Sequence, residues 1–242
     1  MTTNTSWLQR TTLLIGEAAI QKLASAHVLI VGMGGVGSFA AEFIARAGVG
    51  KLTIVDGDVV DPTNRNRQLP ALATNHGVPK VQIMAQRLQA INPEVELSPV
   101  QAFIQPAMVQ ELLSSKPHYL VDAIDSVTPK LTFLQQAYHS GIPLVSSMGA
   151  GGKMDPTQLQ VADISESYNC PFAQEVRKRL KALGIYKGIE VVFSAEKNRK
   201  ESLMYTDGSN FKKSAYGTMP YLPATFGAVA ASVVIRRLTG NM

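Results

Sequence analysis

A glycine-rich turn near the N-terminus constrains the fold more than any other feature of the sequence. The apolar run 28–31 leads directly into GMGGVGS (32–38), and an amphipathic, helix-like segment follows and ends near Gly48. The glycines that permit the tight turn are Gly32, Gly34, Gly35 and Gly37. Backbone N–H groups at the start of such a helix can face phosphate groups. The motif therefore predicts a nucleotide-binding fold without identifying the nucleotide, and a purely structural turn is the alternative.

Strand-like and helix-like segments alternate along the first 150 residues. We expect strands at 28–31, 51–56, 95–103, 119–125 and 142–147, and helices at 38–47, 75–91, 107–115 and 128–141. This alternation is typical of an α/β fold with a doubly wound, mostly parallel sheet and helices on both faces. The fold class we predict is therefore Rossmann-like.

The pattern changes after the glycines at 149–152. Strands are expected at 158–165 and 188–196, on either side of a basic helix at 171–183. The polar segment 196–214 is predicted to be a loop, and a helix at 223–238 closes the chain. We interpret 1–150 as a nucleotide-binding core, and 151–242 as a C-terminal extension of the same domain that completes the sheet.

Cysteine content and hydropathy exclude several classes of protein. Cys170 is the only cysteine, so neither an internal disulfide nor a cysteine-based zinc site is expected. The N-terminus has no signal-peptide pattern, and the apolar run 224–235 is shorter than the ~20 residues that cross a bilayer. We expect a cytoplasmic protein with no membrane partner.

Acidic residues follow two of the predicted strands. Asp56 comes at the end of the second strand, where a Rossmann fold places the acid that binds ribose hydroxyls. Asp58 fits the same site or a turn or helix cap equally well. Asp125 ends the predicted strand 119–125, and a carboxylate at that edge can hold Mg²⁺ against ATP phosphates. Asp122 is expected to face the sheet or to cap a local turn.

Phosphate-binding side chains cluster after Asp56. They are Asn64, Arg65, Arg67 and Gln68, together with Lys80 at the start of the next predicted helix. Arg supplies paired donors that suit phosphate oxygens. Each side chain alone could be ordinary protein surface, but five donors around one nucleotide loop favour binding of a triphosphate.

The ordered motifs GMGGVGS, DGDVVDPTNRNRQ, GVPK and DAIDSV resemble the ubiquitin-activating-like adenylating enzymes, the group of MoeB, ThiF and HesA. The resemblance implies that Arg67, Lys80 and Asp125 are catalytic and that Asp125 organises Mg²⁺. It further implies ATP contacts from Gly32, Gly34, Gly35, Gly37, Asp56, Asp58, Asn64, Arg67, Gln68 and Lys80. Arg10 aligns with an arginine that reaches the partner subunit's ATP in some members, which implies a homodimer.

The second half resembles one branch of that group, the tRNA threonylcarbamoyladenosine dehydratases, through SMGAGGKMDPTQLQVADIS and GTMPYLPATFGAVAA. This implies ATP-dependent cyclisation of the threonylcarbamoyl group on a tRNA adenosine next to the anticodon. No enzyme nucleophile is then required, and a structural role for Cys170 is favoured over catalysis. The two CxxC pairs usual in MoeB and ThiF are absent.

The distribution of charge fits an RNA substrate. The net charge is +5, and residues 151–242 hold 13 Lys+Arg against 8 Asp+Glu. We expect tRNA phosphates to contact Lys153, Arg177, Lys178, Arg179, Lys181 and the 197–213 loop. A solvated surface with no such role is the simpler interpretation of the same charges.

Other functions remain open at this point. The principal alternative is adenylation of the C-terminus of a ubiquitin-like sulfur carrier, as in MoeB and ThiF. A dinucleotide-dependent oxidoreductase has no candidate hydride-transfer residues, and a non-catalytic nucleotide sensor would not need the phosphate cluster. The sequence leaves open a sulfur-relay partner protein and a monovalent cation near the later strands.

Overall fold

The computed structural model describes residues 6–205 and 214–240. Its main sheet has seven strands in the order β3-β2-β1-β4-β5-β7-β6. The strands are β1 (His27–Val31), β2 (Lys51–Val55), β3 (Glu96–Val100), β4 (Tyr119–Asp122), β5 (Leu144–Ser147), β6 (Leu159–Asp163) and β7 (Glu190–Ser194). All neighbouring strands are parallel except β6, which is antiparallel to β7. The predicted Rossmann-like α/β class is confirmed.

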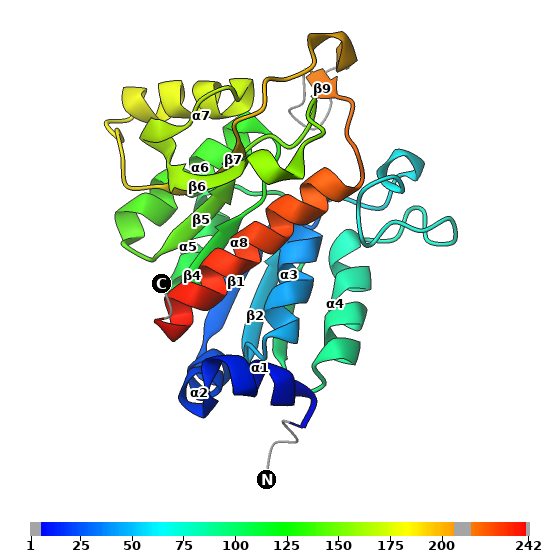
Figure 1. Ribbon diagram of the computed structural model, residues 1–242, viewed down its shortest axis with the longest axis vertical. Helices are drawn as coiled ribbons and strands as arrows, with labels where there is room; N and C mark the ends of the chain where they lie inside the picture. Colours follow the sequence, from blue (N-terminus) through cyan, green and yellow to red (C-terminus); the bar gives the residue numbers. More distant parts are fainter. Residues whose placement is uncertain (1–5, 206–213, 241–242) are drawn as a thin grey trace.

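Helices cover both faces of the sheet (Figure 1). They are α1 (Gln9–Ile15), α2 (Glu17–Ser25), α3 (Gly37–Arg46), α4 (Lys80–Ile91), α5 (Pro106–Ser114), α6 (Val127–Ser140), α7 (Pro171–Ala182) and α8 (Tyr221–Thr239). Helices α2, α3, α4 and α8 contribute to the apolar core on one face, and α5, α6 and α7 contribute to the core on the other. None of the described helices is long and apolar enough to cross a membrane.

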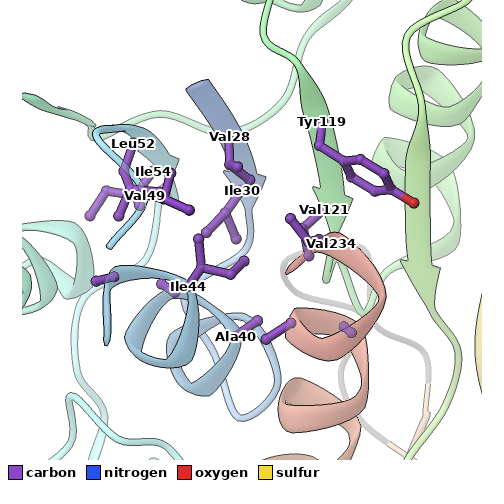
Figure 2. Close-up of a cluster of buried hydrophobic side chains, with 14 of the residues drawn as sticks. Val28, Ile30, Ala40, Ile44, Val49, Leu52, Ile54, Tyr119, Val121 and Val234 are labelled. Carbon is purple, nitrogen blue, oxygen red and sulfur yellow. The ribbon is translucent and has the colours of Figure 1, made fainter. Parts of the chain in front are cut away.

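Buried parallel strands explain the continuous apolar runs of the sequence. All five residues of β1 are buried, with Val28 and Ile30 on one face of the sheet and Leu29 and Val31 on the other. Figure 2 shows Val28 and Ile30 beside Ile44 of α3, with Val234 of α8 close to β4. Both faces of these strands must therefore be apolar, which removes the alternation typical of half-exposed strands.

Helix α8 joins the C-terminal part of the chain to the glycine-rich turn. It packs against α3, and Gly227 makes this crossing close. A Cβ atom on Gly227 would lie 2.5 Å from the carbonyl oxygen of Val36. The last helix of the sequence thus supports the glycine-rich turn near its start.

Three predicted boundaries were wrong. Helix α4 begins at Lys80 rather than at residue 75, because Pro79 immediately precedes its first turn. Strand β4 ends at Asp122, three residues before Asp125. The segment 196–214 is not all loop: it contains η5 (Lys200–Ser202), and β8 (Leu203–Tyr205) pairs antiparallel with β9 (Ser214–Tyr216). Residues 206–213 of the predicted loop lie outside the described residues.

Strand β3 forms one edge of the sheet. It contains Pro99, which is aligned with Ile54 of β2 and is exposed to solvent. Proline has no N–H to donate, so it is tolerated at a sheet edge and excluded from a central strand.

Candidate active site

A cavity of about 620 Å³ opens at the carboxyl ends of the parallel strands. Strand β1 lies between β2 and β4, so the strand order reverses at β1. Open α/β sheets bind their ligands at this position. One side of the cavity is formed by the turn after β1, the loops after β2 and β4, and Lys80, and we call it the nucleotide side. The opposite side, formed by residues 147–151 and 170–172 and by the β8–β9 hairpin, is the C-terminal side.

The glycine turn forms part of the nucleotide side. Gly32, Gly34 and Gly35 line the cavity, whereas Gly37 does not. Gly37 begins α3, and a Cβ atom there would lie 1.7 Å from the carbonyl oxygen of Gly32. This glycine therefore allows the helix to start against the turn, and its contact with a ligand stays a prediction.

Asp56 and Asp58 both line the cavity. The Asp56 carboxylate accepts the N–H of Met33 at 2.6 Å and that of Asp58 at 2.8 Å, which fixes its orientation. Burial raises the pKa of Asp56, against the opposing effects of Lys80 and these two N–H groups. The carboxylate can still accept further hydrogen bonds, since each oxygen can accept more than one.

Lys80 reaches the cavity from the first turn of α4. Its side chain is only 5% exposed, and its Nζ lies 2.9 Å from Oδ2 of Asp58. The sequence left two roles open for Asp58, and the structure gives it a further one as the partner of this lysine. The ion pair therefore fixes the orientation of this cation at the cavity.

Arg67 and Gln68 follow the second strand and also line the cavity. Arg67 Nη1 donates to the carbonyl oxygen of Thr63 at 3.1 Å and to the side chain of Asn66 at 2.8 Å. Gln68 is buried, and its amide lies close to Gly34. Asn64 Oδ1 accepts the N–H of Asp61 in a capping box, and the residue does not line the cavity, so its phosphate contact stays a prediction.

Asp125 lies in the exposed loop between β4 and α6 rather than at a strand end. It still lines the cavity, so the loop carries the carboxylate to the position that the sequence predicted for the strand. No group of three or more His, Cys, Asp or Glu within residues 6–205 and 214–240 could hold a metal ion. A single carboxylate still fits Mg²⁺, which keeps several waters and binds substrate phosphates.

Two exposed aromatic residues at the cavity were not identified from the sequence. Phe103, which follows β3, is 52% exposed and packs its ring against Gly57. Tyr205 of β8 is 82% exposed and lines the cavity on the C-terminal side. An aromatic residue just after a strand on the ligand-binding edge is the signal that could have indicated Phe103.

The glycine segment at 149–152 holds the hairpin in place on the C-terminal side. Asn198 Nδ2 donates to the carbonyl oxygen of Gly151 at 2.9 Å, and the N–H of Arg199 donates to that of Gly152 at 2.8 Å. The N–H of Gly152 in turn donates to the carbonyl oxygen of Gly217 at 2.8 Å. This motif therefore contributes backbone contacts to the hairpin.

The structure corrects two of the predicted tRNA-binding residues. Lys153 is 2% exposed, and its Nζ donates to the carbonyl oxygens of Asn169, Ser194 and Glu196. Burial lowers the pKa of Lys153. Arg177 is half-buried and donates to the carbonyl oxygen of Ser167 at 2.7 Å. Lys178, Arg179 and Lys181 are exposed on α7, and Arg179 pairs with Glu175.

Arg10 lies on α1, which Figure 1 places at the end of the molecule opposite the β8–β9 hairpin. It does not line the cavity of its own chain. The same short helix exposes Leu13 by 82% and Leu14 by 85%. This arrangement leaves Arg10 with no role in the cavity that its own chain forms.

Comparison with known proteins places this geometry in a family. The sequence profile of the ThiF family matches residues 8–242. The chain belongs to the ThiF family. It is 40% identical to the tRNA threonylcarbamoyladenosine dehydratase of Escherichia coli, over 96% of this chain and 94% of the relative. It is 38% identical to the Bacillus subtilis protein of that name, over 95% of this chain and 93% of the relative.

Solved structures of ThiF-family proteins agree with this assignment. The E. coli dehydratase in complex with ATP superposes with a TM-score of 0.88 at 38% identity, covering 99% of this chain and 96% of the other. A structure of the same protein with AMP gives the same TM-score.

A second group of relatives matches a smaller part of the sequence. The E. coli molybdopterin-synthase adenylyltransferase is 33% identical, over 62% of this chain and 60% of the relative.

Proposed function

We propose that this ThiF-family chain is an ATP-dependent dehydratase that cyclises N6-threonylcarbamoyladenosine in tRNA, next to the anticodon. The observation that carries the proposal is the joining of two unlike sides in one cavity. The nucleotide side brings phosphate-binding groups to the turn after β1. The C-terminal side, from a part of the chain that the named dehydratases share, is the side that we assign to the modified nucleoside.

The chemistry follows from the carboxylate of the threonyl group. One carboxylate oxygen attacks the α-phosphorus of ATP, the bond from that phosphorus to the bridging oxygen breaks, and pyrophosphate leaves. Arg67 and Lys80 stabilise the negative charge on the phosphates, as cationic side chains do in phosphoryl and nucleotidyl transfer. A nucleophile of the same carbamoyl group then attacks the acyl carbon, loses its proton and expels AMP. The product lacks one water relative to the substrate.

Asp125 is the residue that we assign to Mg²⁺. When bound, Mg²⁺ would neutralise phosphate charge beside the reacting centre. Asp56 is assigned to the ribose hydroxyls, and Gly32, Gly34 and Gly35 to the close approach of the phosphates. Gln68, buried beside Gly34, and Asp58, paired with Lys80, support this arrangement.

The tRNA partner is assigned to the basic surface of the C-terminal part. Lys178, Arg179 and Lys181 are exposed along α7, whose first residues line the cavity. Such residues bind phosphates without reading sequence. We assign the reaction to the cytoplasm, where ATP and tRNA both occur.

A homodimer is also proposed, with Arg10 serving the partner's cavity. Its support is the exposure of Leu13 and Leu14 on α1 next to Arg10, since a pair of largely exposed leucines on one short helix favours a surface that a partner covers. Replacing both leucines with Glu should convert a dimer to a monomer in light scattering. An unchanged molar mass would contradict this interface.

The deciding experiment incubates the purified protein with Mg-ATP and threonylcarbamoylated tRNA, then weighs the nucleosides after digestion. Loss of one water only when ATP is present supports the proposal. No mass change, with ATP–pyrophosphate exchange only on addition of a ubiquitin-like sulfur carrier, supports the alternative of sulfur-carrier adenylation. That alternative rests on relatives such as the molybdopterin-synthase adenylyltransferases, which match only about two thirds of the chain.

A further inference from the structure

Lys130 is a fully buried cation directly behind the cavity. It lies in the first turns of α6, and its side chain and that of Asp122 are both 0% exposed. A buried charge is costly unless it is paired and hydrogen-bonded. The contacts of Lys130 therefore indicate which part of the structure this buried charge holds in place.

The Lys130 ammonium contacts three oxygen atoms from two strand ends. Its Nζ lies 2.7 Å from Oδ2 of Asp122, and it donates to the carbonyl oxygens of Ile124 at 3.0 Å and Ser147 at 2.9 Å. An ammonium group has three N–H donors, so these contacts use its full capacity. The ring of Phe172 lies 5.6 Å from Nζ, measured to its centroid.

The other ligands of Asp122 complete the same cluster. Its Oδ2 accepts the hydroxyl of Ser146 at 2.6 Å, and its Oδ1 accepts the N–H of Ile124 at 3.0 Å. The backbone of Ile124 is thus held at both its N–H and its carbonyl oxygen. The next residue along the chain is Asp125.

Each group that Lys130 holds borders the cavity. Ile124 and Ser147 line it from the ends of β4 and β5, and Phe172 lines it from the start of α7. The cluster thus connects the loop that carries Asp125, on the nucleotide side, to residues of the C-terminal side. The sequence interpretation assigned no role to Lys130 and only a local one to Asp122.

We propose that Lys130 is a positioning residue for adenylation: it fixes the backbone of Ile124 and thereby the position of Asp125 relative to Ser147 and Phe172. This inference rests on the proposed function, because Asp125 is the acid that it positions. A role in stability alone is the competing explanation. Replacing a buried ion pair by apolar or neutral groups is often neutral for stability or even stabilising.

The test removes both charges together. Lys130→Met alone would leave the Asp122 carboxylate buried without its cation, and the protein would be expected to lose its fold. In the double variant Asp122→Asn/Lys130→Met neither charge remains, so the melting temperature should fall far less than in the single variant. The two carbonyl oxygens, however, no longer have this donor.

Positioning predicts a specific kinetic result for this double variant with Mg-ATP and threonylcarbamoylated tRNA. We expect kcat to fall by roughly tenfold to a hundredfold, as displacement of a reacting group by about 1 Å does, while KM for ATP changes little. Wild-type kcat in a stably folded double variant would overturn the proposal. Absence of dehydration by the unaltered protein would instead contradict the proposed function, so the two failures are distinguishable.

Two further variants keep the result decisive. Asp122→Asn/Lys130→Gln returns amide donors at the same site, so it should recover part of the kcat that the methionine pair loses. A glutamine pair whose kcat is no higher than that of the folded methionine pair would also overturn the proposal. Glu42→Gln/Arg87→Met is the matched control, because it removes an ion pair between α3 and α4 that does not line the cavity. Its kcat should be unchanged, and a loss equal to that of the methionine pair would point to general destabilisation.

Discussion

The two sides of the cavity are built from different chemistry. The nucleotide side presents Asp56, Arg67, Lys80 and Asp125, each from a loop or helix start at the carboxyl edge of the sheet. The C-terminal side presents mainly glycine backbone, Phe172 and the β8–β9 hairpin, and Lys153, which follows this side in the sequence, is turned into the protein and does not line the cavity. The charged side chains of the cavity are therefore concentrated on one side, while the other presents mainly shape and backbone polar groups.

The largest effect on the reaction rate should come from the nucleotide side of the cavity. Asp125→Ala is expected to lower kcat for dehydration by about a hundredfold or more, the size of losses seen when a preorganised electrostatic group is removed. Nucleoside mass analysis of single-turnover reactions measures it. Thr128→Ala, an exposed neighbour in α6, is the control and should leave the rate unchanged. Equal rates for the Asp125 variant and the control would contradict the view that the charged side of the cavity carries the chemistry.

The contact that joins the two parts of the chain gives the next prediction. Gly227→Ala places a Cβ atom 2.5 Å from the carbonyl oxygen of Val36, so α8 must move away from α3. Overpacking of this kind costs about 1–3 kcal/mol of the free energy of unfolding, which urea titration measures. Unchanged stability would mean that α8 can shift freely against the glycine turn.

Asp56→Asn should weaken ATP binding by roughly tenfold, because the neutral amide loses charge-assisted bonds to ribose hydroxyls. Burial raises the pKa of Asp56 above its ordinary value of 3.8, so the folded protein retains this proton at pH values where the unfolded chain has lost it. The contribution of Asp56 to stability therefore falls as the pH rises through that interval. Calorimetry across this range should show a smaller decline in the variant, and an equal decline would contradict the burial argument.

Charges on the outer surface should have a smaller effect. Replacing Lys178, Arg179 and Lys181 with Ala should weaken tRNA binding several-fold and reduce the slope of log K against log salt concentration by about one for each phosphate that these side chains neutralise. ATP affinity should not change. Arg177 stays in this design because it holds the carbonyl oxygen of Ser167. An unaltered salt slope would show that tRNA phosphates contact a different surface of the protein.

The smallest effect is expected at Cys170. It is 5% exposed, and it lines the C-terminal side at the start of α7. Cys170→Ala should keep kcat within about twofold, since removal of a small buried side chain perturbs packing and ring closure uses a nucleophile of the substrate. Complete loss of activity in a folded variant would assign a covalent role to the thiol.

Much of the fold could be predicted from local patterns. Buried parallel strands give continuous apolar runs, and glycine turns and prolines mark where these end, so β1, β2, β5 and β7 follow from the sequence directly. The hairpin strands β8 and β9 did not, because they have only three residues each and are only partly buried. Residues that flank the hairpin are held by hydrogen bonds to Gly151 and Gly152, which are remote from it in sequence.

The site was predictable where side chains follow strand ends, and not where burial decides their role. Asp56, Arg67 and Lys80 lie on the cavity because the topology brings those ends together. Lys153 and Lys130 have the same sequence character as surface lysines, yet both are buried by contacts with carbonyl oxygens far along the chain. Nothing local distinguishes such a lysine from one that binds RNA.

The proline in β3 has a consequence for how the folded protein behaves at high concentration. An exposed sheet edge offers a row of N–H and C=O groups on which a second chain can add a strand. At Pro99 this edge has no N–H, so an incoming strand would leave one of its carbonyl groups without a donor. One side chain in an edge strand thus discourages the open-ended sheet growth that leads to aggregation.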